Sequence, residues 1–87
     1  MLVPTTRYKK DLKRARKRNW DLGKLADILT ILENGKSLPF NARPHRLTGD
    51  WKGYWECHVG PDWLLIYKNL DEEVRLARTG THADLFE

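Results

Sequence analysis

The sequence contains a single cysteine, Cys57, so no disulfide can form within the chain. No apolar run approaches the roughly 18–20 residues that cross a membrane, and no cationic stretch followed by an apolar one marks a secretion signal. A Gly-rich phosphate loop, a serine nucleophile motif and a paired-carboxylate signature are also missing. The lone cysteine and the lack of a long apolar run and of a secretion signal argue against a membrane or secreted protein, and a reducing cytoplasm is the expected location.

The length and composition indicate one folded domain over residues 1–87. A chain of 87 residues has no room for a second core. Its 40% hydrophobic and 10% aromatic residues are sufficient for one modest core.

Positive charge is concentrated near the start of the sequence. Half of the 16 Lys and Arg lie in residues 7–18, where only Asp11 interrupts them: Arg7, Lys9, Lys10, Lys13, Arg14, Arg16, Lys17 and Arg18. Such a run is typical of a protein whose partner carries many phosphates or carboxylates. The alternative is a solvated helix face without a partner.

The first half of the chain predicts two helices. Tyr8, Leu12 and Ala15 form a narrow apolar stripe over residues 7–18, which Thr6 can cap. Asp21 can cap a second helix, and Gly35 can end it. Its apolar face consists of Leu22, Leu25, Ala26, Leu29 and Leu32, widened by Ile28 and Ile31. Residues 19–21 connect the two predicted helices, and so short a connection predicts a helical hairpin.

The second half has a β pattern after a loop over residues 36–46. In "YWECHV", Trp55, Cys57 and Val59 face one way and Tyr54, Glu56 and His58 the other. "WLLIYK" is apolar on both faces and predicts a central strand, "VRLART" predicts another, and Leu2 and Val3 could add an edge strand. The predicted class is α+β: an N-terminal helical hairpin packed on a three- to four-stranded antiparallel sheet, with a short C-terminal helical turn.

Three histidines carry the candidate chemistry: His45 in the loop, His58 on a strand, and His82 after the last strand. They lie thirteen or more residues apart with no second Cys, which argues against a zinc site. Cys57 and His58 point to opposite faces of a strand and cannot form a dyad. No metal or cofactor is therefore expected.

Metal-independent RNA cleavage fits the remaining inventory. A base must take the proton of the 2′-hydroxyl and an acid must protonate the departing 5′-oxygen, and histidine suits both roles. Arginine can stabilise the transition-state phosphate, and aromatic rings can stack on unpaired bases. The candidates are His45, His58, His82, Asp62, Arg78, Trp63 and Phe86.

Two long motifs carry a family resemblance. "LTGDWKGYWECHVGPDWLLIYK" and "RTGTHADLF" resemble the YafQ branch of the RelE-type toxins of bacterial toxin–antitoxin pairs, as do "KKDLKRARKR" and "DLGKLADILTIL". The resemblance implies a RelE-like fold and a ribosome-dependent endoribonuclease that cuts messenger RNA in the A site. It also implies a cognate antitoxin as partner.

The resemblance further implies roles for individual residues. His82 is expected to be catalytic and Phe86 to belong to the site; Arg78 matches the phosphate-binding arginine, and His58, Asp62, Trp63 and His45 match other site positions. Relatives usually read Asp-His-Pro-Leu where this chain has "PHRL", so the backbone around His45 can differ.

The basic helix then becomes a candidate surface for docking on ribosomal RNA, with Lys13, Arg14, Lys17 and Arg18 as the expected contacts. The alternative function is a catalytically inactive, toxin-like module that binds RNA or protein. The intact set of histidines and Arg78 argues against it.

Overall fold

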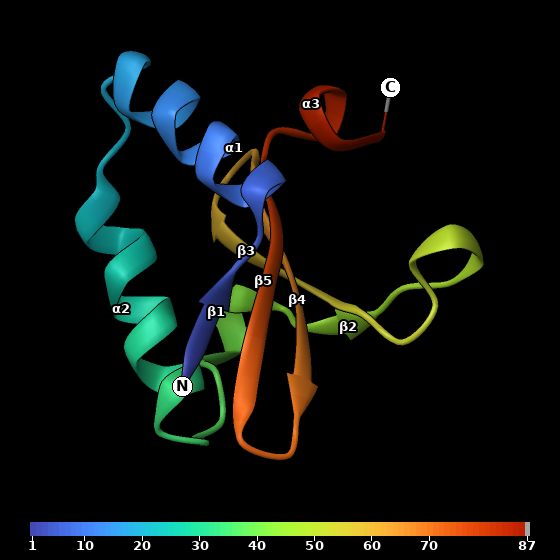
Figure 1. Cartoon of the computed structure of the whole chain (residues 1–87). Helices are drawn as coiled ribbons and strands as arrows, with labels where there is room; N and C mark the ends of the chain where they lie inside the picture. The colour runs from blue at the N-terminus through green and yellow to red at the C-terminus, as the bar shows by residue number, and fades with distance from the viewer. Residues whose placement is uncertain (87) are drawn as a thin grey trace.

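A five-stranded mixed sheet forms the centre of the protein, and the α+β class predicted from the sequence is confirmed (Figure 1). The computed structural model describes residues 1–86. Its helices are α1 (Thr6–Lys17), α2 (Leu22–Glu33) and α3 (His82–Phe86). Its strands are β1 (Leu2–Pro4), β2 (His45–Arg46), β3 (Trp55–Gly60), β4 (Trp63–Leu70) and β5 (Glu73–Gly80), and 3₁₀ turns occupy Phe40–Ala42 and Gly49–Trp51.

The sheet has the order β1-β5-β4-β3-β2, which is larger and more mixed than the sequence predicted. Strands β2 to β5 form an antiparallel meander, but β1 pairs with β5 in parallel, with Leu2 opposite Val74. Residues 45 and 46, predicted to be loop, pair with Glu56 and Trp55. The strand at residues 45–46 was not predicted because two residues are too few to show an alternating pattern. The parallel pairing of β1 was not predicted because its partner strand lies some 70 residues away in the sequence.

Both long helices end and begin at capping residues. Thr5, not the predicted Thr6, accepts the Tyr8 N–H at 3.1 Å, and Asp21 accepts the Gly23 N–H at 3.0 Å as predicted. Gly35 ends α2 in the left-handed region at φ 67°. Its N–H donates to Leu32 O while the Lys36 N–H donates to Ile31 O, the two bonds of a Schellman motif.

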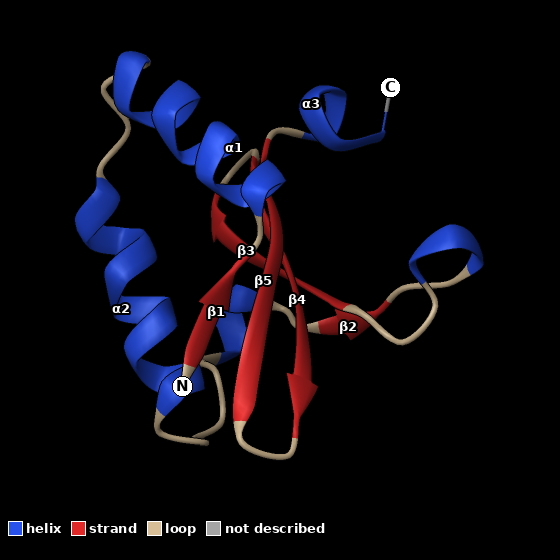
Figure 2. Ribbon diagram, in the orientation of Figure 1, coloured by secondary structure: helices blue, strands red, loops and turns tan. Residues whose placement is uncertain are grey.

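The main core lies between the long helices and the sheet. Figure 2 shows α1 and α2 on the same flank of the strands, with α1 against β5 and α2 against β3 and β5. Leu25, Ile28 and Leu32 of α2 are buried with Leu65 and Tyr67 of β4.

The predicted face of α2 was wrong in detail. Leu29 is only half-buried and Ala26 is exposed, whereas Ile28 lies in the core. An apolar stripe this wide leaves the rotation of the helix to its tertiary contacts.

A second, smaller cluster covers the opposite face. Leu64, Ile66 and Ala77 of the sheet pack with Leu85 of α3. Strand β4 is therefore buried on both faces, as its sequence predicted. Helix α3 therefore packs on the sheet just after β5 ends, and this contact keeps the residues after Gly80 beside the sheet.

Candidate active site

The imidazole of His82 is held at the start of α3 by Asp62, the last residue of the turn between β3 and β4. Asp62 Oδ1 lies 3.1 Å from His82 Nδ1 and also accepts the His82 backbone N–H at 3.2 Å. The imidazole side-chain bond and then the backbone bond hold the pKa of the Asp62 carboxyl below its usual value. Both side chains are more than half exposed. With Nδ1 engaged, Nε2 is the nitrogen that can exchange a proton with a bound molecule.

A capping box fixes the beginning of α3. Thr81 Oγ1 accepts the Asp84 N–H at 3.1 Å, and Asp84 Oδ2 accepts the Thr81 N–H at 3.0 Å. Asp84 also binds Arg18 at 2.7 Å and Arg14 at 3.2 Å, both from α1. The Arg18 hydrogen bond is the largest cause that holds the pKa of Asp84 far below its usual range. Sequence reasoning missed Asp84, although its place three residues after Thr81 is a recognisable capping signal.

Arg78 lies on β5 with its guanidinium largely enclosed. Its Nε and Nη2 donate to the Asp11 carboxylate of α1 at 2.6 and 3.1 Å, and the Asp11 Oδ2 also accepts the Thr79 N–H at 3.1 Å. Asp11, the residue that interrupts the basic run, is thus buried. Its carboxylate takes the Thr79 N–H at the edge of β5, past the residues of β5 that pair with β1. The pair leaves Nη1 as the edge of Arg78 that can face a phosphate.

His45 pairs with a carboxylate that the sequence analysis did not single out for the site. His45 Nε2 lies 3.1 Å from Glu56 Oε1, and its Nδ1 lies 3.2 Å from Arg43 O. Glu56 is buried at 4% exposure, while His45 is exposed on β2. The alternation of β3 places Glu56 on the face of His58, and a carboxylate within so apolar a strand was the available signal.

His58 shares a face of β3 with Glu56. Ile66 of β4 pairs with both Glu56 and Arg78, so one face of the sheet carries Glu56, His58 and Arg78. This face also includes Ile66 and Leu64, on which α3 packs through Leu85. The structure therefore gathers residues from β2, β3, β5 and α3 around one face and end of the sheet.

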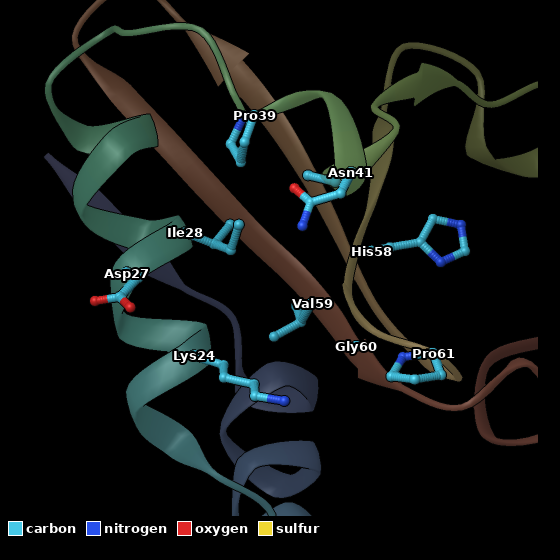
Figure 3. Close-up of a pocket in the computed structure, with 10 residues that line it drawn as sticks. Lys24, Asp27, Ile28, Pro39, Asn41, His58, Val59, Gly60 and Pro61 are labelled. Atoms are coloured by element: carbon cyan, nitrogen blue, oxygen red, sulfur yellow. The ribbon is translucent and has the colours of Figure 1, made fainter.

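A cavity of about 460 Å³ lies on the other side of β3, between α2 and the 3₁₀ turn at residues 40–42 (Figure 3). Lys24, Asn41 and Val59 face it, whereas the His58 ring points away from α2. His58 thus contributes to the rim of the cavity, while its imidazole lies toward the opposite face of the sheet.

The two predicted aromatic contacts differ in accessibility. Trp63 is buried; its Nε1 donates to Thr79 Oγ1 at 2.8 Å and its ring lies 4.9 Å from that of Trp20. Little of the Trp63 ring is therefore open to a base, because the first residue of β4 faces the core, and its role in substrate binding stays a prediction. Phe86 is 45% exposed, with its ring 6.2 Å from that of His82, and remains accessible to a planar ligand.

The four predicted docking residues of α1 also divide into two kinds. Lys13 and Lys17 are exposed, and no ion pair within residues 1–86 involves them. Arg14 and Arg18 are bound to Asp84. The basic helix therefore presents a free lysine face beside an arginine face that holds α3.

Two negative findings concern the part of the chain that the structure describes. Residues 1–86 contain no group of three or more His, Cys, Asp or Glu placed to hold a metal ion. None of the helices in the same range has the length and apolarity needed to span a membrane.

Comparison with known proteins identifies close relatives. The family model described as "Bacterial toxin of type II toxin-antitoxin system, YafQ" matches residues 1–87. The mRNA interferase toxin YafQ of Escherichia coli K12 is 51% identical over 80 residues, which are 91% of this chain and 87% of the relative.

Solved structures of the same family superpose closely. YafQ from E. coli BL21(DE3) matches with a TM-score of 0.95 at 43% identity, covering 100% of this chain and 98% of that chain. The E. coli DinJ–YafQ toxin–antitoxin complex matches with a TM-score of 0.91 at 46% identity, covering 100% and 97%.

Proposed function

Because the chain belongs to the YafQ family of bacterial type II toxins and is an mRNA interferase, we propose that it cuts messenger RNA in the ribosomal A site by histidine acid–base catalysis. The observation that carries this proposal is the exposed His82 imidazole, oriented by Asp62 and flanked by Phe86. The reaction takes place in the cytoplasm, where translating ribosomes are found.

The proposed reaction consists of two proton transfers around one phosphate. A base removes the proton of the 2′-hydroxyl, the 2′-oxygen attacks the neighbouring phosphorus, and the bond from phosphorus to the 5′-oxygen breaks. An acid donates a proton to that leaving oxygen, so the products are a 2′,3′-cyclic phosphate and a 5′-hydroxyl. His82 performs one transfer through Nε2, and the second falls to His58, since both ring nitrogens of His45 are engaged, by Glu56 and by Arg43 O.

The other residues position these groups and the substrate. Asp62 keeps His82 Nδ1 engaged, and Glu56 does the same for His45 Nε2. Arg78 offers its remaining edge to the phosphate whose charge grows in the transition state. Phe86 stacks on an unpaired base.

Docking on the ribosome uses the exposed lysines of α1. Lys13 and Lys17 lie on the solvent side of the helix, where they can replace counterions along ribosomal RNA. A cognate antitoxin is the proposed inhibitor, by analogy with the relative solved in complex with DinJ.

Single-turnover cleavage of ribosome-bound messenger RNA tests the proposal. His82→Gln is expected to lower the rate by roughly 10²–10⁴-fold while ribosome binding is retained. Asp62→Asn is expected to lower it less, and Asp71→Asn, a matched change in the distant β4–β5 turn, to leave it unaltered.

Two outcomes would contradict the proposal. A folded His82→Gln variant that cleaves within threefold of the parent removes His82 from the chemistry. A parent chain that binds ribosomes but neither cleaves nor arrests growth would favour the inactive binding module. Growth arrest that is relieved by the neighbouring open reading frame supports the toxin and its antitoxin.

A further inference from the structure

We infer that Asp84 is a positioning residue for His82 through its ion pairs with Arg14 and Arg18 of α1, which we call the Asp84 clasp. These two arginines then hold the segment that carries His82 and do not serve docking. The inference rests on the proposed function, since it concerns the placement of the histidine in that reaction. It assigns Arg14 and Arg18 a different role from that of Lys13 and Lys17 on the same helix.

The Asp84 carboxylate is the common acceptor of four groups. Both of its oxygens bind the Arg18 guanidinium, at 2.7 and 3.1 Å, and Arg14 approaches Oδ1 at 3.2 Å. Oδ2 also takes the N–H of Thr81, the residue that immediately precedes His82. The side chain is only 12% exposed although its partners come from the surface of α1.

Close packing beneath the carboxylate fixes its position further. A Cβ atom at Gly80 would lie 2.9 Å from both Cβ and Oδ2 of Asp84, so the end of β5 has room for Asp84 only because residue 80 is glycine. Arg78 Nη2 lies 3.4 Å from the Asp84 carbonyl oxygen. Asp84 is thus held from α1, from β5 and from the turn at Thr81.

A helix of five residues cannot hold itself in place. Isolated helices shorter than about 12 residues are marginal in water, so α3 depends on tertiary contacts. Two such contacts are Leu85, buried against Ile66 and Leu64, and the Asp84 clasp. Leu85 anchors the far end of α3, whereas the clasp acts two residues from His82. The clasp is therefore the contact that sets where the imidazole meets Asp62.

Geometry also limits what Arg14 and Arg18 can do for RNA. Arg18 gives Nη1 and Nη2 to Asp84, and Arg14 gives Nη1. A phosphate that took these groups would have to displace a carboxylate already bound in two places. The lysines at positions 13 and 17 carry the same charge without such a partner in the described chain.

The test compares two doubly substituted variants that each lose two positive charges from α1. Arg14→Gln/Arg18→Gln is expected to lower the maximal single-turnover rate about 10–100-fold, the loss that a misplaced catalytic group causes. Lys13→Gln/Lys17→Gln is expected instead to raise the toxin concentration that gives half-maximal rate, because its residues dock. Folding of each variant is checked by circular dichroism and thermal melting.

Asp84→Asn supplies the second arm. The amide oxygen can still accept the Thr81 N–H, so the capping bond survives while the charge that attracts both arginines is lost. This variant is expected to lower the maximal rate as Arg14→Gln/Arg18→Gln does. Combining the three changes is expected to add no further loss, since all of them remove one interaction.

The results that would overturn the inference differ from those that would overturn the function. If the parent cleaves and Asp84→Asn stays within threefold of it, the clasp does not position His82. The inference also fails if the losses from Asp84→Asn and Arg14→Gln/Arg18→Gln multiply, or if the arginine pair affects only the half-maximal concentration. A parent that fails to cleave contradicts the proposed function itself.

Discussion

Asp11 and Arg78 form a buried ion pair with two hydrogen bonds between residues 67 positions apart. It joins the basic helix to the strand that leads into α3, and its carboxylate also satisfies the Thr79 N–H. Asp11→Ala would leave a charge and a backbone donor without their partner. We expect a loss of about 3–5 kcal/mol in the free energy of unfolding, measured with urea.

The matched control for Asp11 is Asp27→Ala, which removes an exposed carboxylate from α2. Its expected effect is within about 0.5 kcal/mol. An Asp11→Ala variant as stable as the Asp27→Ala variant would mean that the pair contributes nothing net to folding.

Two neighbouring leucines of α2 test which side of the helix meets the core. Leu25 is 2% exposed, so Leu25→Ala is expected to cost about 2–5 kcal/mol of unfolding free energy. Leu29 is half-buried and should lose clearly less on the same substitution. Urea unfolding of both variants gives the comparison, and equal losses would place Leu29 in the core after all.

The stability contributed by Asp84 should depend on pH in a defined direction. Its pKa is held far below the usual aspartate value by Arg18 and Thr81, so the charged form is the one that stabilises the fold. That contribution is complete above the unfolded-state pKa of about 3.9 and is lost as pH falls below it. The stability difference between the parent and Asp84→Asn, measured with urea from pH 7 to pH 2, should therefore shrink below about pH 4. A difference that stays constant over this range would refute the ion pair.

Cys57 should be unreactive in the folded protein. Burial, and then the charge of Glu56, raises the pKa of its thiol to about 12. At pH 8 only about one molecule in 10⁴ would carry the thiolate that attacks an alkylating agent. Iodoacetamide should thus label the native chain far more slowly than the urea-unfolded chain, whereas similar rates would indicate that the strand opens readily.

Local patterns in the sequence predicted most of the fold. The caps at Asp21 and Gly35, the alternation of β3 and the doubly buried β4 depend on neighbouring residues, and all are present in the structure. The parallel pairing of β1 was not predicted, because it depends on residues some 70 positions away.

The candidate site was predicted as an inventory of residue types, without their partners. The structure adds those partners: Asp11 for Arg78, Glu56 for His45, and Asp84 for two arginines that the sequence assigns to docking. A charged residue on a helix is expected to be exposed to solvent. Only tertiary contacts show whether it faces a ligand or another part of the same chain. Trp63 illustrates the same limit, since its aromatic character was evident but its burial was not.

The parallel pairing of β1 with β5 also orders the events of folding. Strand β5 meets β4 across a two-residue turn but meets β1 only after a loop of some 70 residues has closed, and such long-range closure is slow. Asp11 lies in α1, the element that follows β1, so it reaches Arg78 with the same closure. A nascent chain whose residues beyond Leu70 are still inside the ribosome that makes it therefore has neither β5 nor α3. Arg78, His82 and Asp84 all lie beyond Leu70, so the candidate site is assembled only after β5 and α3 have left the ribosome.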